Sequence, residues 1–503
     1  MPALLRRLTW PGLLLASFCV VAPASARDFT ADLLSNPQTF AQPPFRTDSL
    51  LVRFQPAADM ARMQSNLARH YGAVSLKVVG AAEHGWFDVR IAANAASRRD
   101  AVRNIIDTYR RLEADPTVAK VTFNWTFKAD YAPNDPYAVD DGDPSDRNVD
   151  QFYLYYMNAL DAWDLSKGSS GVTVAVVDSG VAVSHPDLKN IIASGGYDFA
   201  DNDSNPATDI AGDKGNGDGV DNNGDGYTDV GVSHGTHVAG LIAGIMDNGA
   251  GIAGTAGGGT RILPVRVMTD EGAGDLNAIA NGLKYAADHG ADVINMSLGM
   301  PQKLWCIIPI PPDQLGAMSD AVAYAYGKGV AIFAATGNAA ENGTSCGVSY
   351  PAALDGVFAV GSSNRAGQRS YYSDFGGSYG QVAATALGGD FVKNGEDISV
   401  TEWVWSTWVV SKGAADASNG QYQPGQHTYS GALGTSMATP EAAGLGALVL
   451  SVDPSLTPDE VYAVMRENAK DIGSAGVDAE TGYGQVDFLA TLEAAATSTV
   501  AVN

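Results

Sequence analysis

Residues 172–178 read VTVAVVD, a mostly apolar run that ends in an aspartate. Further runs of this kind follow downstream, and segments with helical periodicity lie between several of them. Parallel strands that are covered on both faces are apolar along their whole length, whereas half-exposed strands alternate apolar and polar residues. The pattern predicts an α/β fold, a mostly parallel sheet with helices on both faces. The other predicted strands are 261–267, 292–298, 330–336 and 357–362, and the predicted helices are 237–245, 276–289, 318–329 and 441–450.

Four polar residues stand at the ends of predicted strands or beside predicted helices. Asp178 ends the first strand, Asn338 follows the strand 330–336, His234 opens a helix, and Ser436 lies just before another. In such sheets active sites gather at the carboxyl ends of the strands. Acyl transfer needs a serine nucleophile, a histidine base, an orienting carboxylate and a donor for the oxyanion. Each residue alone is also explained as a cap or turn residue; together they predict a serine hydrolase.

The motifs VVDSGV (176–181), HGTHVAG (234–240) and GTSMATP (434–440) follow one another in the order Asp, His, Ser. They resemble the active-site motifs of the subtilisin family of serine proteases, in particular its thermitase-like members, and the resemblance runs from residue 131 to about 491. It implies that Asp178 orients His234, the general base and acid. It also implies that Ser436 is the nucleophile and that Asn338 lines the oxyanion hole. The segments implied to bind peptide are Ser297, Leu298, Gly299, Ala335, Thr336 and Gly337.

The chain departs from the family pattern in several places. Glu441 stands where the family usually has histidine, and we expect altered packing there rather than lost chemistry. His237, one helical turn beyond His234, is expected to be structural. Insertions occur at about 301–314 and 390–428, and the sequence leaves open whether they shape the cleft. Because no acidic residues can be assigned around the cleft, the resemblance predicts broad cleavage after apolar or neutral residues.

The N-terminal part has a different texture. Residues 1–26 combine two arginines, an apolar run and a final Ala-Ser-Ala, the order of a secretory signal peptide, so we expect a secreted protein. Residues 47–128 predict a β-α-β-β-α-β order, the split βαβ of small ferredoxin-like α+β domains. Its position resembles that of the subtilase propeptide, a folding chaperone and inhibitor. This implies a propeptide over 27–130 and a catalytic domain over 131–503.

Charge is distributed unevenly along the chain. Residues 1–128 contain 16 Lys and Arg against 10 Asp and Glu, whereas the remainder contains 15 against 46. An acidic body repels phosphates, which argues against a nucleic-acid partner, and mean hydropathy near zero argues against membrane spans. The expected partners are peptide substrates and the oppositely charged propeptide, and the mature protein is expected to be a monomer.

Two cysteines remain once the signal peptide is removed. Cys306 and Cys346 form an even pair in an oxidising compartment, where a disulfide across this loop would stabilise the fold by a few kcal/mol. Two separate buried thiols are the alternative.

Clusters of Asp and Asn in glycine-rich loops are typical of calcium sites, because Ca²⁺ takes several oxygen ligands. Resemblance to family sites implies a first set of Asp135, Asp187 and Asn248, and a second of Asp198, Asp201 and Asp203. A third set matches an EF-hand loop, except that Val232 replaces the final Glu: Asp221, Asn223, Asp225, Tyr227 and Asp229.

The sequence therefore predicts a calcium-stabilised serine endopeptidase made as a zymogen. Two other hypotheses remain: a catalytically silent calcium-binding or adhesive module, and a processing protease of narrow specificity.

Overall fold

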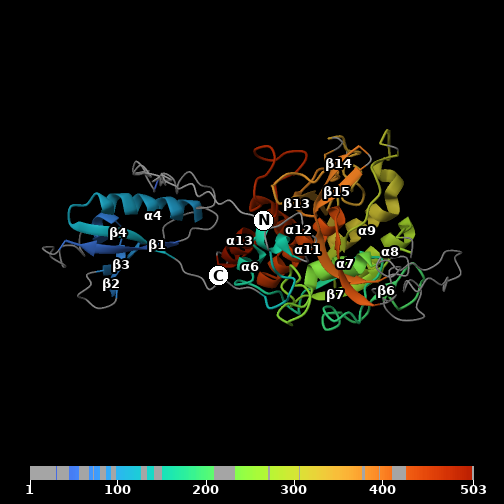
Figure 1. Cartoon of the computed structure of the whole chain (residues 1–503), viewed down its shortest axis with the longest axis horizontal. Coiled ribbons are helices and arrows are strands. Elements are labelled where there is room, and N and C mark those ends of the chain that lie inside the picture. Colours follow the sequence, from blue (N-terminus) through green and yellow to red (C-terminus); the bar gives the residue numbers. More distant parts are fainter. Residues whose placement is uncertain are drawn as a thin grey trace, which may run out of the picture. The chain divides into compact units, whose positions relative to one another are not determined.

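The chain divides into two compact units, Met1–Ala129 and Asp130–Asn503 (Figure 1). Each unit is described below by itself. The structure is a computed structural model, and it describes residues 30, 45–55, 67–71, 73–79, 86–91, 98–125, 133–140, 150–208, 233–269, 272–304, 306–341, 343–376, 380–395, 397–410 and 426–500.

The first unit contains a four-stranded antiparallel sheet in the order β2-β3-β1-β4. Residues 67–71 are helical and precede β2, so the order of elements is the predicted β-α-β-β-α-β. The bounds are β1 Phe45–Phe54, β2 Ala73–Val79, β3 Trp86–Ile91, α4 Arg98–Glu113 and β4 Val118–Trp125.

Helix α4 packs its apolar side against this sheet (Figure 1). Val102, Ile105 and Ile106 are buried at helical spacing and contact buried strand residues such as Leu50. Strand β1 begins two residues before the predicted domain start at 47, because Phe45 pairs with β4 and stacks on Phe123 at 4.2 Å between ring centroids. The prediction of a small α+β domain ahead of the main fold is confirmed.

The second unit is built on a seven-stranded sheet in the order β13-β12-β11-β8-β5-β7-β6. All its strand pairs are parallel. The five predicted strands are present, each with its ends within two residues of the prediction. Strands β6 and β13 were not predicted, because runs of two and four residues carry too little pattern. The bounds are β5 Thr173–Asp178, β6 Tyr197–Asp198, β7 Arg261–Arg266, β8 Val293–Met296, β11 Ala331–Ala335, β12 Val357–Ser363 and β13 Ala384–Leu387.

The side chains of the central strands alternate between two hydrophobic cores. In β5, Val174 and Val176 belong to one core, whereas Ala175 and Val177 belong to the other. Successive side chains of a strand point to opposite faces, so a strand that is buried on both faces must be apolar throughout. This explains the continuous apolar run that the sequence shows at 172–177.

Helices cover both faces of the sheet, as predicted (Figure 1). The first core contains residues of α7 His234–Ala243 and α11 Thr435–Val452, and the second contains residues of α8 Leu276–Asp288 and α9 Gly316–Gly327. The subtilisin-like α/β architecture is therefore confirmed.

Shorter elements surround this framework. The antiparallel pair β14–β15 falls in the predicted insertion at 390–428, and β9–β10 falls in that at 301–314. Strand β16 also lies in the larger insertion, but its antiparallel partner β17 extends beyond the predicted end. Among the described residues, none of the helices combines the length and the apolar character that a membrane crossing requires. The remaining bounds are α5 Phe152–Tyr156, α6 Ala159–Ala162, β9 Lys303–Leu304, β10 Ile308–Pro309, η2 Pro312–Leu315, β14 Asp390–Asn394, β15 Asp397–Glu402, β16 Val404–Val409, β17 His427–Ala432, α12 Pro458–Glu467 and α13 Phe488–Val500.

Candidate active site

Asp178 and His234 are hydrogen-bonded across the carboxyl end of the sheet. Asp178 is the last residue of β5 and is fully buried, and its Oδ1 lies 2.8 Å from Nδ1 of His234, the first residue of α7. The same oxygen accepts the backbone N–H of Ser179 at 2.7 Å. Burial lowers the pKa of His234, but the charge and hydrogen bond of Asp178 outweigh this effect, so its pKa is raised above 6.5. The pair thus has the geometry of an imidazole held by a carboxylate.

Strand β16 fixes the helix that carries His234. Ser406 donates to the carbonyl oxygen of His237, and Thr407 donates to that of Thr236, both at 2.7 Å. His237 is fully buried, and its Nε2 lies 3.1 Å from two carbonyl oxygens of the β16–β17 hairpin. Burial lowers the pKa of His237 to about 3, so this ring is neutral and donates from Nε2. The prediction that His237 is structural is confirmed.

Ser436 lies in the first turn of α11, not before the helix as the sequence suggested. The helix starts at Thr435 and continues through Pro440. Proline has no N–H to donate to the carbonyl four residues earlier, which here belongs to Ser436. Ser297 donates to that carbonyl at 2.8 Å instead, and the Ser436 hydroxyl donates back to the Ser297 carbonyl at 3.1 Å. The helix therefore tolerates Pro440 because Ser297, just beyond β8, supplies the missing donor.

Asn338 follows β11 and faces the start of the same helix. Its Oδ1 accepts hydrogen bonds from the N–H and the hydroxyl of Thr435, both at 2.9 Å. With the oxygen so engaged, the Nδ2 group is left without a hydrogen-bond partner within the described part of the chain and lies beside Gly434, two residues before Ser436. The side chain is thus oriented as a donor toward the cavity next to Ser436.

Two adjoining cavities lie along this edge of the sheet. One, of about 460 Å³, is lined by His234 and by apolar residues including Met268, Leu276, Ile279 and Met318. The other, of about 320 Å³, is lined by Ser436, Asn338 and Asp374. Five of the six residues that the resemblance assigned to peptide binding line them: Ser297, Leu298, Gly299, Ala335 and Gly337. Thr336 is fully buried with its backbone bonded to Val360 and Ser349, so it does not line either cavity.

The first predicted calcium set is brought together. Asp187 accepts hydrogen bonds from the Asn248 amide at 2.7 Å and from the Tyr429 hydroxyl at 2.8 Å. Asp135 accepts the backbone N–H groups of Asp247 and Asn248. Burial raises the pKa of Asp135, the backbone donors oppose this effect, and the charge of Asp187 adds to the increase. Neither carboxylate has an ion pair among the described residues, and rotation of the Asn248 amide would add an oxygen ligand, so this set fits a bound cation.

Two carboxylates of the second predicted calcium set are paired with an arginine. The Arg266 guanidinium is buried, and its Nη1 lies 2.5 Å from carboxylate oxygens of both Asp198 and Asp201. The third member, Asp203, accepts the N–H of Asn205 at 2.8 Å. Arginine supplies the positive charge that the resemblance assigned to Ca²⁺, so these residues do not fit a calcium site.

The EF-hand-like set lies outside the described residues. Asp221, Asn223, Asp225, Tyr227 and Asp229 fall within 209–232, of which the structure describes nothing. In the part of the chain that is described, no three His, Cys, Asp or Glu side chains are arranged to hold a metal ion.

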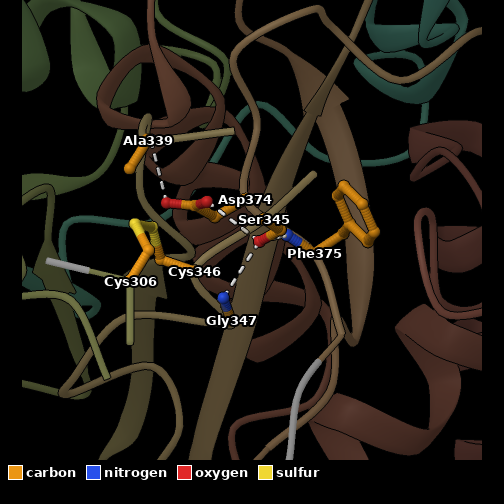
Figure 2. The surroundings of a disulfide bond; sticks show 7 residues. All are labelled: Cys306, Ala339, Ser345, Cys346, Gly347, Asp374 and Phe375. Carbon is orange, nitrogen blue, oxygen red and sulfur yellow. Dashed lines mark hydrogen bonds between the residues drawn. A yellow bond between two sulfur atoms is a disulfide. The ribbon is translucent and has the colours of Figure 1, made fainter. Parts of the chain in front are cut away.

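Cys306 and Cys346 form the disulfide that the sequence favoured over two separate thiols (Figure 2). It joins the 301–314 insertion to the segment that follows Asn338. Met300 and Tyr350 also pair their backbones here, so the two segments beside the smaller cavity are connected twice.

Glu441 is fully buried in α11. Its Oε2 accepts the N–H of Leu387 at 2.8 Å, and its Oε1 has no partner within the described part of the chain. Burial raises the pKa of Glu441 well above its usual range, and the N–H of Leu387 only partly opposes this effect. The residue is part of the core, and the expectation that it alters packing rather than chemistry stays a prediction.

Sequence reasoning missed two residues at these sites. Asp374 lines the cavity next to Ser436, and Arg266 neutralises an acidic loop. A buried-strand arginine is a signal in itself, because a charge there needs a partner. Asp374 has no such signal, since it lies in a loop among ordinary polar residues.

Comparison with known proteins is consistent with this geometry. A sequence profile of the Subtilase family matches residues 169–484. Thermitase of Thermoactinomyces vulgaris is 34% identical over 348 residues, which cover 69% of this chain and 94% of thermitase. The thermophilic serine proteinase of Bacillus sp. strain AK1 is 34% identical over 355 residues, covering 70% of this chain and 67% of that protein.

A solved protease structure from Pseudoalteromonas arctica is similar in fold. It is 30% identical with a TM-score of 0.56, and the match covers 73% of this chain and all of that one. Several related proteins are extracellular proteases, among them a halolysin-like protease of Natrialba magadii. The site geometry, the fold and these matches agree: the chain belongs to the subtilase family and is a subtilisin-like serine protease.

Proposed function

We propose that Asp178, His234 and Ser436 are the catalytic triad of this protease and that Asn338 is its oxyanion donor. The observation that carries this assignment is the buried carboxylate of Asp178 at 2.8 Å from Nδ1 of His234. A bond at Nδ1 fixes the neutral ring in the tautomer whose Nε2 is free to accept a proton. Ser436 lies at the start of α11, where it is linked through Ser297 to the same edge of the sheet.

In this mechanism Ser436 Oγ attacks the peptide carbonyl as Nε2 of His234 takes its proton. Asp178 stabilises the imidazolium that forms. Negative charge then develops on the carbonyl oxygen, where the free Nδ2 group of Asn338 and the N–H of Ser436 donate to it. The imidazolium returns its proton to the leaving amine, and a water repeats the sequence on the acyl-enzyme.

We also propose that calcium stabilises the fold, at two of the three predicted sites. Asp135, Asp187 and Asn248 would hold one ion, because the two carboxylates are buried without a counter-charge among the described residues. The loop with Asp221 and Asp225 would hold another, on its sequence alone. We do not propose an ion at Asp198, where Arg266 is bound.

We further propose that the protein is secreted as a zymogen, with a signal peptide at 1–26, a propeptide at 27–130 and a catalytic domain at 131–503. The separate small unit and its opposite charge support this organisation. Expression of Ser436→Ala in a host without related proteases tests it. The variant should accumulate as unprocessed precursor, and normal maturation would show that the chain does not cleave itself.

A catalytically silent calcium-binding module is the alternative to an active enzyme. Labelling of the mature protein with a serine-directed fluorophosphonate, together with hydrolysis of casein, separates the two. The proposal requires both, and it requires that Ser436→Ala abolish both. Absence of label on correctly processed protein would favour the silent module.

A further inference from the structure

The cavity beside Ser436 contains a carboxylate. This cavity of about 320 Å³ is lined by Ser436, Asn338, Leu298 and Gly299, and also by Gly337 and the buried residues Ser349 and Asp374. It opens next to the proposed nucleophile and oxyanion donor. If the proposed function holds, it therefore receives the P1 side chain, the one next to the bond that is cleaved.

The absence of a side chain at Gly337 leaves two polar groups of this cavity accessible to a ligand. A Cβ atom at this position would lie 2.5 Å from the Ser349 hydroxyl and 2.6 Å from Oδ2 of Asp374. Gly337 also has a φ of +106°, which an L side chain rarely adopts. Any larger residue would therefore cover the two polar groups, whereas glycine leaves them at the cavity.

Burial raises the pKa of Asp374, but hydrogen-bond donors to both carboxylate oxygens oppose this effect and favour the charged form. Ser345 accepts N–H bonds from Gly347 and Phe375, both at 3.0 Å, so its single proton is directed to Oδ1 of Asp374 at 2.9 Å (Figure 2). Ala339 donates its N–H to Oδ2 at 2.9 Å, and the N–H of Cys346 also favours the charged form. The disulfide of Cys346 anchors this set of donors.

Within the described ranges no protein cation pairs with this carboxylate. Asp374 is only 1% exposed and has no ion pair among the described residues. Arg369 acts on it only at longer range. Its guanidinium is bonded to Glu480 at 3.2 Å and to backbone carbonyls, and it stacks on Phe375. A buried carboxylate without a counter-ion is unfavourable, and a ligand that brings a positive charge removes the penalty.

The Ser349 hydroxyl provides a second polar group at the same place. It is 3% exposed, and in the described part of the chain it has no hydrogen-bond partner. A side chain that ends in several N–H donors can bond to it and to Asp374 together, whereas an apolar side chain leaves both unsatisfied.

We propose that this cavity selects lysine or arginine at P1, and that Asp374 is the residue that determines this specificity. The enzyme then cleaves after basic residues rather than broadly after apolar ones. The principle is that a site with a buried polar group rejects ligands that leave it unpaired.

The experiment measures kcat/KM on peptides that differ only at P1. The residues are lysine, arginine, norleucine, Nε-acetyl-lysine and phenylalanine. Norleucine has the length of lysine without its charge, and acetyl-lysine keeps the nitrogen but is neutral. We expect lysine to exceed norleucine and acetyl-lysine by at least about tenfold. Parity between lysine and norleucine, or a preference for phenylalanine, would overturn the proposal without use of any variant.

Asp374→Asn then tests the assigned residue. The ratio of kcat/KM for lysine to that for norleucine should fall at least about tenfold. Glu341→Gln is the matched control, since it removes one negative charge two residues from the Ala339 donor, at a side chain that is 54% exposed and paired with Lys393. It should leave the ratio unchanged. A ratio that is equal in Asp374→Asn and the parent would remove Asp374 from the assignment.

These outcomes separate this proposal from the proposed function. Loss of fluorophosphonate labelling and of all peptide cleavage in the parent protein contradicts the triad assignment. Retained labelling, with cleavage that shows no preference for basic P1 residues, contradicts only the role of Asp374.

Discussion

Oδ1 of Asp178 accepts two hydrogen bonds, from Nδ1 of His234 at 2.8 Å and from the N–H of Ser179, whereas its buried Oδ2 has none in the described part of the chain. Apart from the N–H of Ser179, the carboxylate therefore acts on one group, the imidazole ring of His234. The pKa of His234 is raised above 6.5 as a result, although burial alone would lower it.

This pair predicts the acid limb of the pH profile. Only neutral His234 accepts the Ser436 proton, so activity is lost as the pH falls through the pKa of this histidine. Because that pKa is raised, half of the maximal kcat/KM should be reached above pH 6.5. Asp178→Asn should shift the limb to lower pH and reduce kcat by about 10⁴. A limb below pH 6 in the parent enzyme would contradict the predicted raised pKa.

Removal of the oxyanion donor should affect turnover rather than binding. Asn338→Ala should lower kcat about 10²- to 10³-fold with little change in KM, the size found when one such donor is lost. Asn468→Ala is the control, since the side chain of this asparagine donates to the carbonyl of Val464 within the last turn of α12. An equal loss in both variants, or a loss confined to KM, would mean that Asn338 acts through structure.

The contact between α7 and β16 predicts a stability effect far from substrate. A Cβ at Gly240 would lie 2.3 Å from Oγ1 of Thr407 and 2.4 Å from Oγ of Ser406. Gly240→Ala should therefore destabilise the fold by about 1–3 kcal/mol, measured by thermal or urea unfolding. Gly327→Ala in α9 is the matched control, because its Cβ would meet nothing within 4 Å. Equal unfolding temperatures for both variants would argue against the tight contact.

Removal of calcium should affect the stability contributed by Asp187 but not that contributed by Asp201. Calcium at 100 times its dissociation constant adds about 2.7 kcal/mol for each site, so EDTA should lower the unfolding temperature. Asp187→Asn should lose part of the stabilisation by calcium. Asp201→Asn, which loses a contact with Arg266, should lower stability equally with and without the ion. A calcium effect that is unchanged in Asp187→Asn would exclude the first site.

Burial of Glu441 should make the free energy of unfolding depend on pH. Its pKa is raised in the fold well above the 4.5 of an exposed glutamate, so the folded state keeps a proton that the unfolded chain releases. Stability from this group is complete below pH 4.5 and declines as the pH rises above it. Glu441→Gln removes this penalty and should raise the unfolding temperature at pH 8 more than at pH 4. Equal changes at both pH values would show that Glu441 is charged in the fold.

The parts of the site that were predictable are those carried by short motifs. Asp178, His234 and Ser436 each stand next to a strand or helix whose pattern is visible in the sequence, and the fold follows from the apolar strands. The predicted start of α11 is too late, because a proline such as Pro440 usually marks the beginning of a helix. The helix accommodates Pro440 through the hydrogen bond from Ser297 to the carbonyl of Ser436, and these two residues are 139 positions apart.

The distant partners of several residues were not predictable, although the position of Arg266 in a buried strand signals that it needs one. Arg266 neutralises Asp198 across 68 positions, and Tyr429 reaches Asp187 across 242. Asp374 acquires its importance from Gly337, Ala339 and Ser345, which are brought together only by the parallel strands and the disulfide. No local pattern in a single sequence shows which distant residues contact one another in the fold.

The bond between Arg266 and the loop after β6 also bears on how the molecule depends on its surroundings. An ion from solution stabilises a loop only when its concentration is high enough. Arg266 is part of β7, so it is in place whenever β5, β6 and β7 pair. Formation of this loop is thus tied to assembly of the sheet and is independent of the divalent-ion content of the medium. The chain therefore carries its own counter-ion at this acidic loop, whereas the ion proposed at Asp135 and Asp187 would have to come from solution.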